Sequence, residues 1–239
     1  MLSKSQIKLI TSLKQKKYRQ QHGFFVVEGV KTITELLNSN LKLHKLYSTE
    51  SFNINAKDEV IISDSDLKRI SYLKTPNKAL AIFKMPTQKS IEKTGLIVAL
   101  DAIRDPGNLG TIIRLCDWFG VKELVCNIET VDCYNPKVIQ ATMGSITRVN
   151  VSYVDLEVFL KEIEVPVFGA FMEGQNVYSK ALPEQGVLVM GNEANGVSKQ
   201  IESIVTEKVS IPRFGDLQAT ESLNVATATA ILLSEFRRQ

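Results

Sequence analysis

The sequence has little of the chemistry on which most hydrolases and metalloenzymes rely. Of its 239 residues only two are histidines, His22 and His44, and the second half of the chain has none. That half therefore cannot by itself form a Ser-His-Asp triad or an HExxH zinc site. The three cysteines are odd in number and form no CxxC pair, which argues against a disulfide framework or a zinc site. We expect no metal ion and a reducing, cytoplasmic environment.

Long apolar runs and glycine fingerprints are also missing. No stretch of 18 uncharged apolar residues is present, so no membrane-spanning helix is expected. Residues 1–17, MLSKSQIKLITSLKQKK, lack the apolar block and the cleavage site of a signal peptide and resemble a basic helix instead. No GxGxxG follows a predicted strand, which excludes a Rossmann dinucleotide site. Any catalysis must therefore use Asn, Arg, Glu, Ser and backbone groups.

Positive charge is concentrated in the first part of the chain. Residues 1–94 contain 17 Lys or Arg and 8 Asp or Glu, whereas residues 95–239 contain 12 and 18. No acidic residue precedes Glu28, but six basic residues do. Such asymmetry indicates a polyanionic partner for the first part, although a solvated basic helix would give the same composition. Nucleic acid is the partner that this pattern favours.

The apolar pattern predicts two domains of α/β architecture. In residues 1–90 we expect a helix at about 3–15 and a helix at 64–74 that is capped by Asp64 or Ser65. The strand-like runs of this part are FFVVE, LHKLYST, VIIS and ALAIFKM. The polar stretch 85–95 is typical of a linker. Residues 91–239 alternate strand-like and helical patterns, which predicts a parallel sheet covered by helices on both faces. The strand-like runs are LIVALD, ELVCNI, RVNVSYV, VPVFGAF, GVLVMG and EKVSIP.

Three polar loops follow strands of this predicted sheet, where open parallel sheets bind their ligands. They are DPGNLG, NEANGVS and RFGDLQATESLN. Asn108 stands where a helix N-cap is expected, and its side chain could either cap the helix or hold a ligand. Arg114 could be a surface arginine paired with Asp117 or Asp101. Glu193 could be a turn residue beside a helix dipole.

The order of the motifs is more informative than any one of them. NLGTIIR (108–114) is followed by MGNEANGVS (190–198) and then by IP (211–212) and SLNVATATAILLSE (222–235). With these motifs, residues 96–238 resemble the SpoU/TrmH group of S-adenosylmethionine-dependent RNA 2′-O-ribose methyltransferases, in the knotted SPOUT superfamily. Residues 24–37 and 62–83 resemble, more weakly, the substrate-binding domain that is appended in that family.

The resemblance implies a fold and a cofactor. Residues 91–239 would form a SPOUT methyltransferase domain with a deep trefoil knot, and residues 1–90 an RNA-binding substrate domain with a basic N-terminal helix. S-adenosylmethionine would lie bent in the knot and be held mainly by backbone groups, which would account for the missing glycine fingerprint. The implied cofactor-binding residues are Met190, Gly191, Asn192, Ile211, Pro212 and Leu223.

The resemblance also implies catalytic residues, which are Asn108, Arg114, Glu193, Ser222 and Asn224. Arg114 would bind the phosphate beside the target ribose by a forked contact and orient the 2′-oxygen. An arginine is also proposed as general base in this family, although arginine ordinarily stays protonated. The other four residues would fix Arg114 and the ribose through hydrogen bonds.

The last motif departs from the usual family pattern. Arg213 and Phe214 follow Pro212 where a Met is usual, and DLQATE lengthens the loop before Ser222. This could be an ordinary insertion, or the Arg–Phe pair could stack on a splayed base.

Ribosomal RNA is the expected substrate, because residues 1–90 resemble domains of rRNA-modifying family members. Transfer RNA is the alternative substrate. The alternative functions are a non-catalytic RNA-binding protein on the same fold and an α/β enzyme for a small anionic substrate. The intact set of motif residues argues against the first of these, and the basic first half argues against the second. The resemblance also implies a homodimer paired through C-terminal regions, with no membrane partner.

Overall fold

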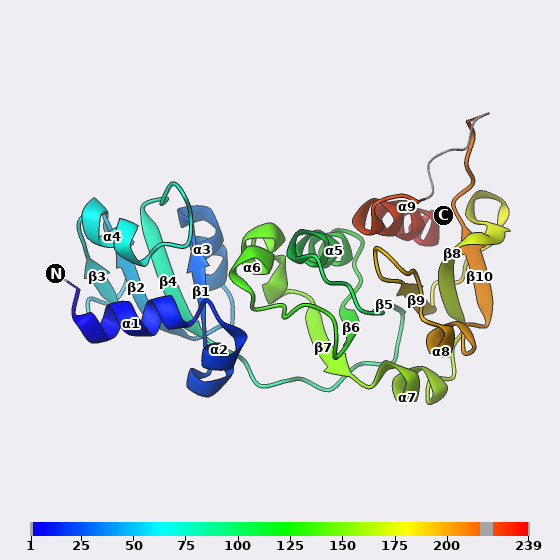
Figure 1. The fold of residues 1–239 in the computed structure, drawn as a ribbon, viewed down its shortest axis with the longest axis horizontal. Coiled ribbons are helices and arrows are strands. Elements are labelled where there is room, and N and C mark those ends of the chain that lie inside the picture. The colour runs from blue at the N-terminus through cyan, green and yellow to red at the C-terminus, as the bar shows by residue number, and fades with distance from the viewer. Residues whose placement is uncertain (1, 216–221, 239) are drawn as a thin grey trace. The chain divides into compact units, whose positions relative to one another are not determined.

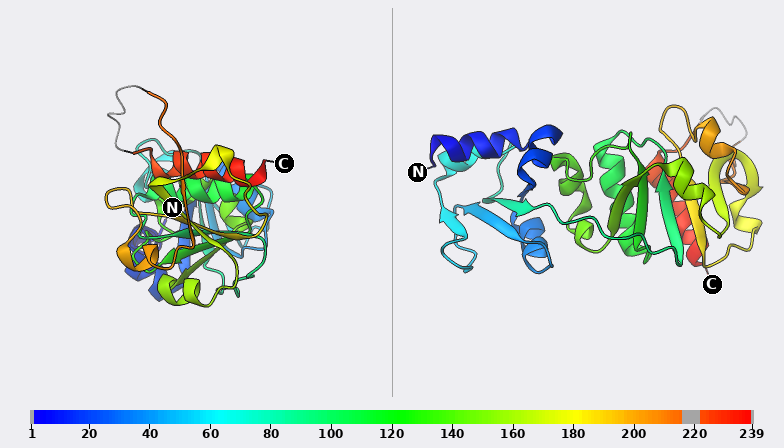
Figure 2. Two further views of the ribbon diagram at one scale, coloured as in Figure 1. Left: turned by 90° about the vertical axis from the view of Figure 1, so that its right-hand side faces the viewer. Right: turned by 90° about the horizontal axis from the view of Figure 1, so that it is seen from below.

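The computed structural model describes residues 2–215 and 222–238. The chain forms two compact units, drawn as ribbons in Figure 1 and Figure 2. The N-terminal unit comprises Met1–Gln88 and Asp132–Thr147, and the C-terminal unit comprises Lys89–Val131 and Arg148–Gln239. The segment Asp132–Thr147 therefore packs with the N-terminal unit, although it stands far along the chain.

A four-stranded sheet with the order β1-β4-β2-β3 forms the centre of the N-terminal unit. β4 runs antiparallel to both β1 and β2, and β3 is parallel to β2. All four strands were predicted from their apolar runs, and the structure confirms them. They are β1 (Phe24–Glu28), β2 (Leu43–Ser48), β3 (Glu59–Ile61) and β4 (Ala79–Lys84).

Helices pack on both faces of this sheet. On one face, α1 and α4 bury Ile10, Leu13, Leu67 and Ile70 in a cluster with sheet residues such as Val26. The right-hand view of Figure 2 shows α1 lying over the sheet. Helices α3 and α6 contact β1. The helices of this unit are α1 (Lys4–Ser12), α2 (Lys16–His22), α3 (Val30–Leu37), α4 (Asp64–Ile70) and α6 (Pro136–Thr142), with the 3₁₀ turn η1 (Ser145–Thr147).

One predicted helix of this unit is shorter than expected, and one predicted cap is wrong. The helix expected at about 3–15 is α1, which ends at Ser12, and α2 follows as a separate helix. The cap of α4 is Ser63, whose Oγ accepts from the backbone N–H of Asp66 at 3.1 Å, and not Asp64 or Ser65. A capping residue stands outside the helix with extended backbone, as Ser63 does with φ −75° and ψ 158°.

A buried arginine joins α2 to the segment Asp132–Thr147. Arg19 is 2% exposed. Its Nη1 donates to the carbonyl oxygens of Leu13 at 3.0 Å and Lys14 at 2.9 Å, and its Nε donates to Asp132 Oδ2 at 3.1 Å. Nη2 binds the same carboxylate oxygen. Since all these groups belong to the N-terminal unit, the ion pair fixes the later segment to the first helices.

Asp132→Ala is expected to lower the free energy of unfolding of the N-terminal unit by about 3–5 kcal/mol, because it leaves the Arg19 guanidinium buried without its counter-charge. Urea unfolding followed by circular dichroism measures the change. Glu50→Ala is the matched control: Glu50 pairs with Lys78 at the surface, where both side chains are more than half exposed. Such a pair contributes about 0–1 kcal/mol, so equal losses in the two variants would contradict the prediction.

Six parallel strands form the sheet of the C-terminal unit, in the order β10-β8-β9-β5-β6-β7. This confirms the parallel α/β fold that the alternating pattern predicts. Every residue of the central strands β5 and β9 is buried, as expected for strands covered on both faces. The strands are β5 (Leu96–Leu100), β6 (Glu123–Asn127), β7 (Asn150–Val154), β8 (Val167–Asn176), β9 (Gly186–Met190) and β10 (Glu207–Ser210).

The helices of the C-terminal unit lie in two layers. In Figure 1, α5 and α9 lie on one side of the sheet and α7 and α8 on the other. The helices are α5 (Pro106–Trp118), α7 (Leu156–Lys161), α8 (Lys199–Glu202) and α9 (Val225–Arg237), with the 3₁₀ turn η2 (Val177–Ser179). Among the helices of both units that the structure describes, none has the length and apolarity needed to cross a membrane.

Candidate functional site

The loops that follow β5 and β9 start side by side. Met190, the last residue of β9, is buried, and its carbonyl oxygen accepts from the backbone N–H of Asp101 at 2.9 Å. Beyond it the backbone N–H groups of Asn192 and Gly196 each donate to the other residue's carbonyl oxygen at 2.9 Å. This reciprocal pair closes a tight loop at the carboxyl end of β9.

Gly191 lies at the base of this closed loop. A Cβ atom added to Gly191 would lie 2.2 Å from both the carbonyl carbon of Gly196 and the nitrogen of Val197. No larger residue therefore fits unless the loop moves. Asn192 Nδ2 also donates to the carbonyl oxygen of Ala102, which attaches the loop after β9 to the loop after β5.

Helix α5 begins in the loop after β5. Its N-cap is Asp105, whose Oδ1 accepts from the backbone N–H of Asn108 at 2.8 Å, and Pro106 is the first helical residue. Of the two alternatives for Asn108, the cap is therefore wrong. Asn108 lies in the first turn of the helix, and its side-chain amide is available for other contacts.

A chain of hydrogen bonds joins the three predicted loops. Asn224 Nδ2 donates to Asn108 Oδ1 at 2.9 Å, and Asn108 Nδ2 donates to Glu193 Oε1 at 3.0 Å. Asn224 also caps α9, because its Oδ1 accepts from the backbone N–H groups of Ala226 and Thr227. The structure thus brings together three of the five predicted catalytic residues.

Glu193 also accepts hydrogen bonds from the backbone of the loop after β5. The N–H of Arg104 donates to Oε2 at 3.4 Å, and that of Asp105 donates to Oε1 at 3.3 Å. Partial burial acts to raise the pKa of Glu193, but donation by Asn108 and by backbone groups outweighs it and holds the pKa below its ordinary value. The carboxylate is therefore ionised at neutral pH and acts as an acceptor.

The contacts of Glu193 predict that the loop after β9 separates from the loop after β5 at low pH. The pKa of Glu193 is lower in the folded protein than in the unfolded chain, so the ionised carboxylate stabilises the folded state. This stabilisation is complete at pH values above the ordinary glutamate pKa of about 4.3. It is lost as the pH falls through the pKa of the folded state. Hydrogen-exchange protection of the Arg104 and Asp105 amides should drop over that range. Glu193→Gln should show the lower protection already at neutral pH. The amide of Val98 in β5 is the control, because its exchange reports global unfolding. Protection of the Arg104 and Asp105 amides that does not change with pH in the wild type would refute the expectation.

Arg114 lies apart from this chain of hydrogen bonds. It is exposed on α5, about 9 Å further along the helix than Asn108 and about 120° around it. Asp117 pairs with Arg148 at 2.8 Å, and the Asp101 carboxylate accepts from other groups, which contradicts the alternative that Arg114 pairs with one of them. Within residues 2–215 and 222–238, no hydrogen bond or ion pair ties Arg114 to another side chain.

The remaining predicted site residues lie around the ends of β9, β10 and α9. Ile211 and Pro212 follow β10 and are partly exposed. Leu223 is 49% exposed, and Ser222 is exposed beside it. Residues 216–221, which make up most of the lengthened loop, lie outside the described residues.

The described start of the lengthened loop carries an exposed aromatic ring. Phe214 is 82% exposed, and its ring centroid lies 6.4 Å from that of Tyr178. Arg213 beside it is also exposed. Stacking of this pair on a splayed base stays a prediction.

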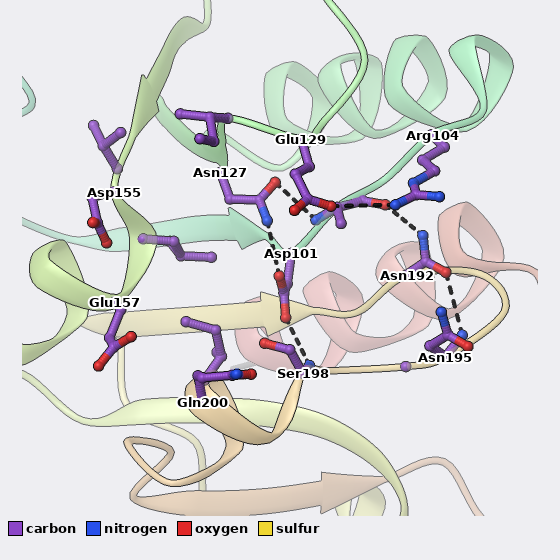
Figure 3. Close-up of a pocket in the computed structure, with 16 residues that line it drawn as sticks. Asp101, Arg104, Asn127, Glu129, Asp155, Glu157, Asn192, Asn195, Ser198 and Gln200 are labelled. Carbon is purple, nitrogen blue, oxygen red and sulfur yellow. Dashed lines mark hydrogen bonds and ion pairs between the residues drawn. The ribbon is translucent and has the colours of Figure 1, made fainter.

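A cavity of about 450 Å³, at the carboxyl ends of β5, β6 and β7, was not predicted (Figure 3). Asp101 lines it and is 4% exposed, accepting from Asn127 Nδ2 at 3.0 Å and from the backbone N–H of Ser198 at 2.7 Å. Arg104 and Glu129 form an ion pair at its rim, 3.2 Å apart. The signal in the sequence is the aspartate that directly ends the apolar run LIVALD. In the part of the chain that the structure describes, no three His, Cys, Asp or Glu side chains are grouped to hold a metal ion.

Comparison with protein families matches both parts of the chain. Residues 95–234 match the SpoU rRNA Methylase family, and residues 4–81 match the MRM3-like substrate binding domain. The 23S rRNA (guanosine(2553)-2'-O)-methyltransferase RlmP of Bacillus subtilis is 28% identical over 235 residues, which cover 94% of this chain and 93% of that protein.

Solved structures show the same similarity over the whole chain. A putative RNA methyltransferase of the TrmH family from Porphyromonas gingivalis has a TM-score of 0.89 and 37% identity, and the match covers 99% of this chain and 98% of that one. An AdoMet-bound rRNA methyltransferase from Sinorhizobium meliloti has a TM-score of 0.87 and 28% identity, with 99% and 96% covered.

Proposed function

Because the chain belongs to the SpoU rRNA methylase family, we propose that it transfers a methyl group from S-adenosylmethionine to a ribose 2′-hydroxyl of ribosomal RNA. The observation that carries the proposal is the hydrogen-bonded chain Asn224–Asn108–Glu193, which joins all three family motifs at one place. RlmP, which is similar along nearly its whole length, is named as a 23S rRNA methyltransferase, and the similar S. meliloti enzyme holds AdoMet.

The residues at the ends of β9 and β10 fit S-adenosylmethionine. The tight loop at Gly191 brings backbone to the carboxyl end of β9, and the exposed Leu223 and the partly exposed Ile211 offer apolar contacts. Met190, Asn192 and Pro212 complete the set that would hold the cofactor. When bound, it supplies a methyl group on a sulfonium, whose thioether is a good leaving group. The proposal includes a deep trefoil knot, in which the C-terminal segment of the chain threads through a loop.

The protein itself must position the 2′-hydroxyl and assist the loss of its proton. Arg114 binds the phosphate beside the target ribose by two parallel N–H···O contacts and orients the 2′-oxygen. Its guanidinium stays protonated, so this role is electrostatic, and the 2′-hydroxyl proton passes to water as the methyl group is transferred. Asn108, Glu193 and Asn224 hold the loops and the ribose through hydrogen bonds, and Ser222 contributes its hydroxyl.

The proposed enzyme is a homodimer. Trp118 is 84% exposed and lies one turn beyond Arg114 on the same side of α5. A partner that covers Trp118 therefore lies beside Arg114, so the arginine acts next to the partner's surface. Sedimentation at micromolar concentration should give a dimer, and Trp118→Glu should shift it toward monomer. A fully active wild-type monomer would contradict this part of the proposal.

Residues 1–90 supply affinity for RNA in this proposal and residues 91–239 supply the chemistry. The excess of Lys and Arg in the first part and the match of residues 4–81 to a substrate binding domain support this division. None of the three motifs that form the hydrogen-bonded site lies in the first part.

The test is methyl transfer from labelled S-adenosylmethionine to ribosomal and transfer RNA from cells that lack the gene. We expect label in ribosomal RNA, at a ribose that becomes resistant to alkaline cleavage on its 3′ side. Label in transfer RNA alone would show that transfer RNA, and not ribosomal RNA, is the substrate. RNA binding without any transfer would favour the non-catalytic alternative.

A further inference from the structure

One end of the N-terminal sheet carries aromatic rings and lysines together. Phe24 starts β1 and pairs with Lys84 at the end of β4. The backbone N–H of Lys84 donates to the carbonyl oxygen of Lys42 at 2.9 Å, so the chain that enters β2 lies at the same end. Lys42 and Lys84 are exposed, and Phe24 is partly exposed.

A β-bulge brings His44 to this cluster. The pairing of β2 with β4 shifts between Leu43 and Lys45, so His44 is the extra residue at the shift. Its ring stacks on that of Phe24, with centroids 4.2 Å apart and an angle of 25° between the planes. Phe24 packs on the apolar core, which anchors the pair, while His44 is partly exposed. Bulges commonly re-aim a side chain in this way beside functional sites.

The chain segments beside this aromatic pair carry only positive charge. The stretches at this end of the sheet, 22–27, 40–46 and 82–88, together contain Lys42, Lys45 and Lys84 and no Asp or Glu. Burial and the nearby Lys45 and Lys84 lower the pKa of His44, so its imidazole is neutral at neutral pH. A neutral stacked ring beside exposed lysines differs from a solvated lysine face, because it presents a flat apolar surface next to cations.

We propose that the Phe24–His44 pair is a stacking platform for an unpaired base of the RNA substrate, with Lys42 and Lys84 binding the flanking phosphates. Unpaired RNA bases are typically recognised by stacking on aromatic rings, including histidine, beside cations that hold the backbone. A base laid on the exposed side of His44 extends the existing stack. The inference rests on the proposed action on RNA and adds where, and in what form, the N-terminal unit binds it.

The test compares His44→Ala and His44→Phe for binding to a short oligoadenylate that carries one 2-aminopurine. His44→Ala should weaken binding roughly 5- to 100-fold, as for one lost base–aromatic stack, and abolish the quenching of 2-aminopurine fluorescence. His44→Phe should retain both. Unchanged affinity and quenching in His44→Ala, or an equal loss of binding to an RNA duplex of the same length, would overturn the platform.

A charge-matched pair of variants tests the lysines. Lys42→Ala with Lys84→Ala removes two cations at the platform, whereas Lys31→Ala with Lys74→Ala removes two exposed cations at the opposite end of β4. The first pair should weaken oligoadenylate binding and the second should leave it within about 2-fold, since screening limits the reach of exposed charges. If both double variants weakened binding equally, Lys42 and Lys84 would contribute only general positive charge, and their assignment to the flanking phosphates would be overturned.

Methylation of ribosomal RNA by the wild type separates this proposal from the function on which it rests. If the wild type methylates ribosomal RNA and His44→Ala binds oligoadenylate as the wild type does, the platform is overturned and the enzymatic function stands. If His44→Ala weakens binding as expected but the wild type transfers no methyl group, the enzymatic function is overturned and the platform stands. Thermal unfolding and S-adenosylmethionine binding of each variant confirm that the chain is folded.

Discussion

Arg114→Ala should leave S-adenosylmethionine binding intact and slow methyl transfer about 100-fold or more, as expected when a catalytic electrostatic group is removed. Arg114 has no structural partner in the described part of the chain, so its removal breaks no ion pair. A purely structural role for an exposed helical arginine would instead change stability by under about 1 kcal/mol and leave turnover unchanged. Single-turnover methylation at saturating RNA, with calorimetric titration of the cofactor, distinguishes these outcomes.

Two further variants sharpen this result. Arg114→Lys should recover little activity, because an ammonium is a point charge and cannot form the forked contact of a guanidinium. Arg148→Ala is the matched control, since it removes an arginine of the same unit that pairs with Asp117. Wild-type turnover in Arg114→Ala would remove this residue from the mechanism.

Gly191→Ala should abolish cofactor binding at concentrations that saturate the wild type. The added Cβ would lie 2.2 Å from backbone atoms of Gly196 and Val197, and backbone cannot rotate away as a flexible side chain can. The loop after β9 must therefore move, and with it Glu193 and its contact with Asn108. Overpacking of this kind costs about 1–3 kcal/mol or more, and here the strain falls on the loop that the cofactor is proposed to contact.

Gly215→Ala is the control for this substitution. It lies in the loop after β10, and a Cβ added there meets no atom of the described residues within 4 Å. Calorimetry should show normal S-adenosylmethionine affinity in Gly215→Ala and none in Gly191→Ala, with both chains folded by circular dichroism. Normal affinity in Gly191→Ala would show that the loop can move without consequence.

Local signals in the sequence predicted the strands well and the helix caps less well. Alternating and continuous apolar runs placed every strand of both sheets, because burial of one or two faces leaves a direct pattern. A cap at Asn108 is one of two alternatives in the sequence, because asparagine favours that position. Pro106 pointed to Asp105 instead, since proline is favoured directly after the cap. Ser63 was missed for a similar reason, as three polar residues in a row compete for one position.

Contacts between distant residues could not be predicted from local pattern. Asn108 lies 85 positions from Glu193 and 116 from Asn224, and only the order of the family motifs suggested that they meet. Arg19 counted among the basic residues of the first segment, yet it is buried against Asp132, 113 positions away. Charge composition therefore overstates the exposed positive charge of the first segment by this residue, because it cannot tell a buried cation from an exposed one.

The interleaved order of the two units limits how this protein can be recombined. The chain crosses from one unit to the other after Gln88, Val131 and Thr147, so no single junction separates them. A chimera that exchanges residues 1–88 alone would leave α6 against a foreign β1 and Asp132 beside a foreign arginine or none. The N-terminal unit is therefore built from two pieces of sequence, and a transplant of this unit has to carry residues 132–147 with it.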